Sequence, residues 1–143
     1  MKISTKGRYA LRMLIDLAEH EGSGYISLKD IAERQDISKK YLEQIIQIFN
    51  KTDVLRANRG AQGGYKLARP ASQYTVAEIL RLTEGSLSPV DCVDRDLGEC
   101  PRSADCPTLP LWRGLSKVIN EYLGSITLQD LVDQHRGGDD YMI

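Results

Sequence analysis

The sequence predicts a mainly α fold: a winged helix-turn-helix with a small β-hairpin wing, a cysteine-bearing loop and a long C-terminal dimerisation helix. Two short amphipathic helical patterns flank a tight turn within residues 27–49. A Gly-rich hairpin pattern follows directly, and apolar residues recur at helical spacing near the end of the chain. We therefore expect three regions: a winged helix-turn-helix domain at 1–85, a cysteine-bearing loop at 86–110, and the dimerisation helix with a C-terminal tail at 111–143.

Periodicity and capping residues place the N-terminal helices. Apolar residues recur at helical spacing from Tyr9 to Ala18, which predicts a supporting helix. Ser27 and Ser38 each precede an apolar periodic segment, as N-cap residues do, and Asp36-Ile37 predicts the turn between the two segments. In the second segment the expected inner face consists of Tyr41, Leu42, Ile45, Ile46 and Phe49.

The elements after the helix-turn-helix are a hairpin and three further helices. Strand-like runs on either side of Asn58–Gly64 predict a wing. Thr75 and Glu78 form a capping box, so a helix should begin there and end at Gly85. A long helix is expected from about Leu111 to Leu123, and Thr127–Asp130 starts a short final one. The apolar residues of the helix after Thr75 are Val76, Ile79, Leu80 and Leu82.

Composition limits the possible functions. The 143 residues are 41% hydrophobic and 27% charged, as in an ordinary globular protein. No apolar run approaches the roughly 20 residues of a membrane span, and the N-terminus lacks the apolar stretch of a signal peptide, so we expect a cytoplasmic protein without a membrane partner. No nucleophile is paired with a base in a known hydrolytic motif, so we expect no enzyme.

Charge is divided unevenly along the chain. Residues 1–70 carry 13 Lys and Arg against 8 Asp and Glu, a net charge of +5. Residues 71–143 carry 6 against 12, a net charge of −6. A basic first half fits a protein that presents one face to a polyanion, although solvated surface alone could give the same division.

The second helix of a helix-turn-helix usually lies in the major groove, with its first residues nearest the bases. Glu43 there could accept a hydrogen bond from a cytosine amino group and Gln44 could pair with adenine, whereas Lys39 and Lys40 suit phosphates. The alternative is that Lys39 and Glu43 form an ordinary i,i+4 ion pair. In this helix we expect the DNA-binding surface to comprise Ser38, Lys39, Lys40, Tyr41, Glu43 and Gln44; Gln47 shares the outer face.

The wing supplies the other expected DNA contacts. Arg59 stands beside Gly60 at the predicted hairpin tip. An arginine at this place can enter a minor groove, and a glycine lets the backbone approach the DNA closely. The alternative is a solvated loop arginine.

All three cysteines lie in one loop, as Cys92-x7-Cys100-x5-Cys106. A disulfide would leave one thiol over, and the cytosol disfavours stable disulfides. Three thiolates on a flexible loop can bind zinc or an iron–sulfur cluster, although both prefer four ligands. Redox-active thiols and structural cysteines without a special role remain alternatives.

The long C-terminal helix carries a broad apolar stripe that needs a partner surface. A matching helix in a second subunit is the simplest partner, and a two-fold dimer suits a palindromic operator. The alternative is that the stripe packs back on its own domain. The stripe consists of Leu111, Trp112, Leu115, Val118, Ile119, Tyr122 and Leu123.

Four segments together resemble the IscR/CymR/NsrR family of bacterial winged-helix transcription regulators, and closest of these the IscR type. They are Met1–Tyr9, Tyr41–Gln44, Arg59–Tyr65 and Glu84–Val90. The resemblance covers nearly the whole chain. It implies a homodimer that binds a double-stranded DNA operator, with Glu43 and Arg59 at the bases.

The resemblance also implies a cofactor. Cys92, Cys100 and Cys106 match, in order, the three cysteines with which IscR-type and NsrR-type proteins bind a 2Fe–2S or related cluster. The IscR pattern places a histidine as fourth ligand where this chain has Leu109, and Arg8 occupies the neighbourhood of the acidic ligand of the NsrR type. The fourth ligand is therefore unassigned; a loop carboxylate, an exogenous ligand and a residue of the other subunit are the alternatives.

The leading hypothesis is a repressor that senses iron–sulfur cluster status, expected to be 2Fe–2S, and controls cluster-assembly genes. A regulator of the same fold that responds to nitric oxide or to cysteine availability, as CymR-type proteins do, is the alternative. An iron–sulfur electron carrier is the third hypothesis, and it requires the basic first half to be incidental.

Overall fold

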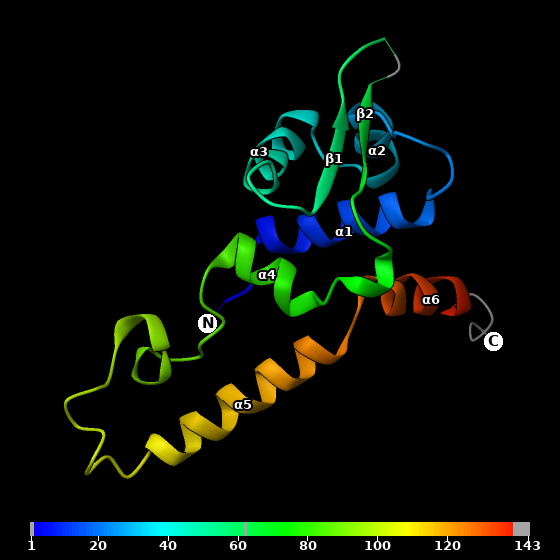
Figure 1. The fold of residues 1–143 in the computed structure, drawn as a ribbon. Helices are drawn as coiled ribbons and strands as arrows, with labels where there is room; N and C mark the ends of the chain where they lie inside the picture. The colour runs from blue at the N-terminus through cyan, green and yellow to red at the C-terminus, as the bar shows by residue number, and fades with distance from the viewer. Residues whose placement is uncertain (1, 62, 139–143) are drawn as a thin grey trace.

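The computed structural model describes residues 2–61 and 63–138 of the chain (Figure 1). Gln62, in the expected wing, and residues 139–143, in the expected tail, lie outside the described residues. Within the described residues, three 3₁₀ turns (Ala71–Gln73, Asp91–Val93 and Arg95–Leu97) accompany the helices and strands α1 (Thr5–Glu19), α2 (Leu28–Gln35), α3 (Lys39–Phe49), β1 (Leu55–Asn58), β2 (Gly64–Leu67), α4 (Val76–Glu84), α5 (Leu109–Ser125) and α6 (Leu128–Gly138).

The mainly α winged helix-turn-helix is confirmed, and α2 and α3 begin where the caps predict. Ser27 accepts a hydrogen bond from the backbone N–H of Asp30, and Ser38 accepts one from that of Tyr41. Asp36 ends α2 in the left-handed conformation, at φ 53°, which turns the chain sharply into α3. The main core, where α1, α2, α3 and the hairpin meet, contains Met13, Leu14, Ile31, Leu42, Ile45, Phe49 and Val54.

An ion pair with a buried carboxylate joins α1 to α2. The Asp16 side chain is only 1% exposed, and Arg34 binds it with Nε and Nη2 at 3.0 and 2.7 Å. Gln35 donates a third hydrogen bond to the same carboxylate, at 3.0 Å. A carboxylate in the interior is tolerated only when it is paired and hydrogen-bonded in this way. The hydrogen bond with Asp16 raises the pKa of Arg34 above its ordinary value.

The hairpin is antiparallel, and it is attached to the chain segment before α2. Leu55 pairs with Leu67 and Asn58 with Gly64, while Ile26 and Tyr65 exchange two backbone hydrogen bonds of 2.8 Å. Gly64 is buried at this contact: a Cβ there would lie 2.3 Å from the carbonyl oxygen of Ile26. Only glycine lets the two backbones approach this closely.

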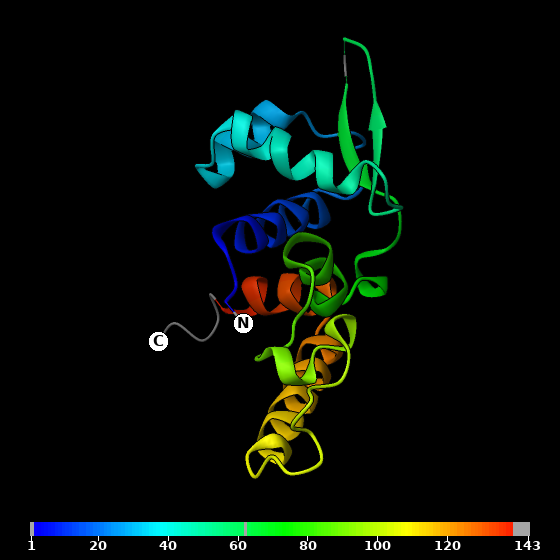
Figure 2. The ribbon, with the colours of Figure 1, turned by 90° about the vertical axis from the view of Figure 1, so that its left-hand side faces the viewer.

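A second, smaller apolar cluster connects α4 to α5 and to residues 87 and 126. Val76, Ala77, Leu80 and Leu87 are buried there, and Leu123 of α5 packs against them. Figures 1 and 2 show α5 extending away from the helix-turn-helix, so that the hairpin and α5 lie at opposite ends of the molecule.

Two sequence expectations differ in detail from the structure. Helix α1 begins at Thr5 rather than Tyr9, because Ser4 caps it and also donates a 2.6 Å hydrogen bond to Glu84. Helix α5 begins at Leu109 rather than Leu111, with a proline in its first turn, where no backbone N–H is needed. Of the apolar residues of α4, Val76, Ile79 and Leu80 are buried, whereas Leu82 is exposed, since it lies roughly 200° around the helix from Leu80.

Among the helices of the described residues, none combines the length and apolar character that a bilayer crossing requires.

Candidate nucleic-acid interface and cysteine loop

Helix α3 presents a polar outer face at the end of the molecule that also carries the hairpin (Figure 1). The inner residues Leu42, Ile45, Ile46 and Phe49 are buried and fix the rotation of the helix. The polar residues therefore point outward, and all five are exposed: Lys39, Lys40, Glu43, Gln44 and Gln47. A helix of this kind can enter a major groove with its first turns foremost.

The side chains at the start of α3 differ in exposure and in whether they already have an interaction partner. Ser38 is exposed, although its hydroxyl already accepts the capping hydrogen bond from Tyr41 at 3.1 Å. Tyr41 is half-buried, because its ring packs edge-on against Tyr9 at 5.5 Å between centroids. Lys39 and Glu43 are both described, and no ion pair joins them. Their charges are thus available to a ligand.

The wing projects beside α3 and carries Arg59 exposed at its turn. Gly60 adopts φ 148°, a conformation that residues with a side chain rarely adopt, so the turn itself requires glycine. A cleft of about 410 Å³ separates the hairpin from the end of α3, and Asn50 and Asn58 line it together with Arg59. The sequence alone does not indicate the two asparagines as site residues, because only the fold brings residue 50 opposite residue 58.

The three cysteines lie far from the wing, on the segment between α4 and α5. Cys92 is exposed, Cys100 and Cys106 are half-buried, and all three thiols are free. A hydrogen bond between Cys106 Sγ and Thr108 Oγ1, 3.4 Å apart, lowers the pKa of this thiol. Free thiols, one of them biased toward thiolate, suit a soft metal centre. The thiols are not pre-assembled, since no three His, Cys, Asp or Glu side chains among the described residues are grouped to hold a metal ion.

The positions at which relatives were expected to supply a fourth ligand carry other chemistry here. Leu109 is 4% exposed and forms the buried start of α5. Arg8 is exposed and donates a hydrogen bond to Thr5 at 3.0 Å. The two histidines contact α1: His20 Nδ1 lies 2.7 Å from the Asp16 carbonyl oxygen, and His135 Nδ1 lies 2.7 Å from Glu19.

The stripe on α5 divides into two faces. Trp112, Ile119 and Leu123 are half-buried, and Leu123 packs against the smaller apolar cluster of the chain's own domain. The other four are exposed to between 40 and 63%: Leu111, Leu115, Val118 and Tyr122. The self-packing alternative therefore accounts for part of the stripe and leaves a contiguous apolar face open, which is unusual for a monomer surface.

Comparison with known proteins gives a single answer. Residues 3–134 match the Rrf2 family, described as an iron-dependent transcriptional regulator. Protein rrf2 of Nitratidesulfovibrio vulgaris is 40% identical over 92% of this chain and 87% of its own, and the transcriptional regulator IscR of Xenorhabdus nematophila is 39% identical over 92% and 79%.

Solved structures agree in fold. CymR, the global cysteine regulator of B. subtilis, superposes with a TM-score of 0.77 at 38% identity, over 93% of this chain and 97% of its own. T. potens IscR superposes with a TM-score of 0.75 at 41% identity, over 94% and 88%. The winged helix with its exposed α3 and wing is thus the fold of known regulators, and the chain belongs to the Rrf2 family of transcriptional regulators, the family of IscR and CymR.

Proposed function

We propose that this regulator binds an iron–sulfur cluster, a 2Fe–2S cluster in the simplest case, through Cys92, Cys100 and Cys106, and that it represses genes of cluster assembly. The single observation that carries the proposal is the placing of all three free thiols on one loop, in a family described as iron-dependent. When bound, the cluster would supply a centre whose occupancy reports iron and sulfide supply.

The DNA-binding part of the proposal assigns roles to α3 and the wing. Glu43 and Gln44 would contact base edges in the major groove, while Lys39 and Lys40 would neutralise phosphates. Arg59, beside Gly60, would enter the adjacent minor groove. Ser38 and Tyr41 would complete the contact surface at the start of α3. As a DNA-binding regulator the protein would act in the cytoplasm.

The protein would bind its operator as a homodimer. The exposed face of α5, formed by Leu111, Leu115, Val118 and Tyr122, would pack against its copy in a second subunit. Each subunit would then place its α3 in one half-site of a palindromic operator.

A second candidate function is thiol sensing without a cluster. It is favoured by the lowered pKa of Cys106 and by the dispersed arrangement of the thiols. The structural similarity to CymR, described as a cysteine regulator, points the same way. Under this alternative the loop would respond by oxidation of its thiols.

Anaerobic reconstitution separates the two candidates. The wild type, Cys92→Ala and the control Ser103→Ala should be compared by visible absorption and by iron and sulfide analysis. We expect a coloured wild type and control with equal amounts of iron and sulfide, and a bleached Cys92→Ala. A colourless wild type that resists reconstitution would overturn the cluster and favour thiol sensing.

A further inference from the structure

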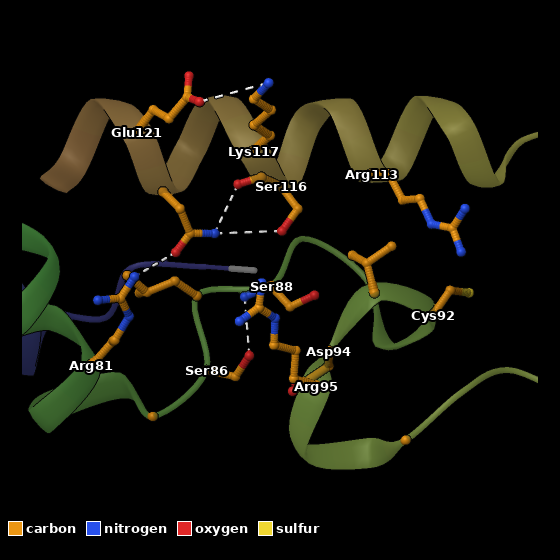
Figure 3. A pocket seen from close by; sticks show the side chains of 15 residues that line it. Arg81, Ser86, Ser88, Cys92, Asp94, Arg95, Arg113, Ser116, Lys117 and Glu121 are labelled. Carbon is orange, nitrogen blue, oxygen red and sulfur yellow. Dashed lines mark hydrogen bonds and ion pairs between the residues drawn. The ribbon is translucent and has the colours of Figure 1, made fainter.

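An open groove of about 1090 Å³ lies between the end of α4, the loop that carries Cys92, and one face of α5 (Figure 3). It lies at the end of the molecule opposite the wing, and the DNA-binding roles proposed above do not use it. Its α5 wall consists of polar side chains on one side of the helix, from Arg113 to Glu121, and is distinct from the exposed apolar face.

The groove gathers positive charge in the acidic half of the chain. Residues 71–143 have a net charge of −6 and contain only six Lys and Arg. Four of these six line this one groove: Arg81, Arg95, Arg113 and Lys117. Asp94 and Glu121 are the acidic residues of the lining, so the groove carries a formal net charge of +2.

Two of the four cationic side chains have a polar partner among the described residues, and two do not. Arg81 donates to Asn120 Oδ1 at 2.6 Å, and Lys117 lies 3.9 Å from Glu121. Within the described part of the chain, the guanidinium groups of Arg95 and Arg113 have neither a hydrogen-bond nor an ion-pair partner. Two guanidinium groups from different segments, the loop and α5, thus border one space with their donors unused (Figure 3).

Hydroxyl groups add further donors. Ser86 Oγ accepts a hydrogen bond from the backbone N–H of Ser88 at 3.1 Å, which leaves its own hydrogen free to donate outward. Ser116 Oγ lies 3.5 Å from Asn120 Nδ2, which donates toward it, and so keeps its hydrogen too. Guanidinium groups together with hydroxyls are the donor set that proteins use for phosphate and carboxylate oxygens.

We propose that the groove is a binding site for a small oxyanion with two or more negative charges, borne by phosphate or carboxylate groups. The anion binds Arg95 from the loop and Arg113 from α5 simultaneously, and so ties the cysteine loop to the dimerisation helix. A ligand that prefers this closed arrangement shifts the protein toward it, which makes the site a second regulatory input beside the cysteine loop.

The test uses the cluster-free full-length protein, so that its result does not depend on the cluster. Inorganic phosphate and citrate serve as probes, at an ionic strength held constant with chloride. Trp112 is the single tryptophan of the chain and precedes Arg113, so its fluorescence reports binding, and calorimetry gives the stoichiometry. We expect saturable binding of one anion per chain by at least one probe, and the preferred probe identifies the phosphate or the carboxylate class.

The chain offers a matched control, because two of its six C-terminal cations lie outside the groove. The double variant Arg95→Gln/Arg113→Gln should weaken binding at least tenfold. The double variant Arg102→Gln/Arg136→Gln removes the same charge and should change the affinity for the anion less than twofold. Circular dichroism checks the fold of both, and Lys117→Gln gives a second, single-charge variant of the groove.

Two results would overturn the proposal. Equal weakening of anion binding in the two double variants would mean that the anion is attracted non-specifically by the positive charges of the chain. Absence of saturable binding of either probe would mean that the groove takes no small anion, as when an acidic segment of the second subunit fills it.

Discussion

Gly64 is the residue at which a single added methyl group should disturb the fold most directly. The Cβ of an alanine would lie within 3 Å of the Ile26 carbonyl group and the Ser27 nitrogen, all backbone atoms. We expect Gly64→Ala to lower the free energy of unfolding by about 2 kcal/mol, because the hairpin must separate from residue 26. Chemical denaturation measures this change. Gly124→Ala, in open space on α5, is the control and should be neutral or up to about 1 kcal/mol stabilising.

Asp16 should contribute about as much to the free energy of unfolding as Gly64, in this case through its charge. Asp16→Asn leaves the Arg34 guanidinium without a carboxylate in a site where the acid is only 1% exposed. We expect a loss of about 2–3 kcal/mol in unfolding free energy, less than for a fully buried pair because Arg34 is partly exposed. The exposed Asp36, whose left-handed conformation asparagine also adopts, offers the control Asp36→Asn. A similar loss in both variants would contradict the role given to this ion pair.

The residues expected at the DNA should separate into two kinds of effect. Glu43→Ala should relax the preference at one base pair by about 1–3 kcal/mol, whereas Lys39→Ala should weaken binding to all sequences and reduce the salt slope by about 1. Fluorescence anisotropy on duplexes selected from a random pool, repeated at several salt concentrations, gives both quantities. Unchanged base preference in Glu43→Ala would remove the residue from the recognition surface.

Among the elements, those set by local chemistry were predictable and those set by distant contacts were less so. The caps Ser27, Ser38 and Thr75 act within three residues, so the starts of α2, α3 and α4 follow from the sequence. The start of α1 does not, because its first turn has few apolar residues and Glu84, 80 positions away, accepts hydrogen bonds from Ser4.

The candidate sites show the same division. The outer face of α3 was predictable, because helical periodicity alone turns Glu43 and Gln44 away from the core. The groove beside Cys92 was not, since its cations come from three segments and only the packing of α5 along the loop unites Arg81, Arg95 and Arg113. Spacing could not show whether the three thiols are assembled, which depends on loop conformation.

Helix α5 leads to a prediction about assembly. Val118 is 61% exposed in the middle of the open apolar face, so Val118→Lys should leave the fold of the subunit intact but place a charge in the proposed dimer interface. We expect sedimentation to show a dimer for the wild type and a monomer for this variant at micromolar concentration. Lys117→Ala, one residue away on the groove side, should remain dimeric. A dimeric Val118→Lys would move the interface elsewhere.

At the scale of the whole molecule, the DNA-binding end and the cysteine-bearing end are connected through the packing of α1 against α4. Glu84, at the end of α4, binds the first turn of α1, and Gly7 is buried against it. Helix α1 in turn packs against α2 and α3. A change in the loop after Gly85 can therefore reach α3 through α4 and α1, provided that the loop has two arrangements of different stability.

The most direct test of this account is the affinity for one operator duplex in the cluster-loaded and the cluster-free state, measured anaerobically by fluorescence anisotropy. We predict dissociation constants that differ at least tenfold between the two states of the wild type, and no such difference between Cys92→Ala before and after the reconstitution treatment. Equal affinity of the loaded and the cluster-free wild type would contradict the claim that the cysteine loop controls DNA binding.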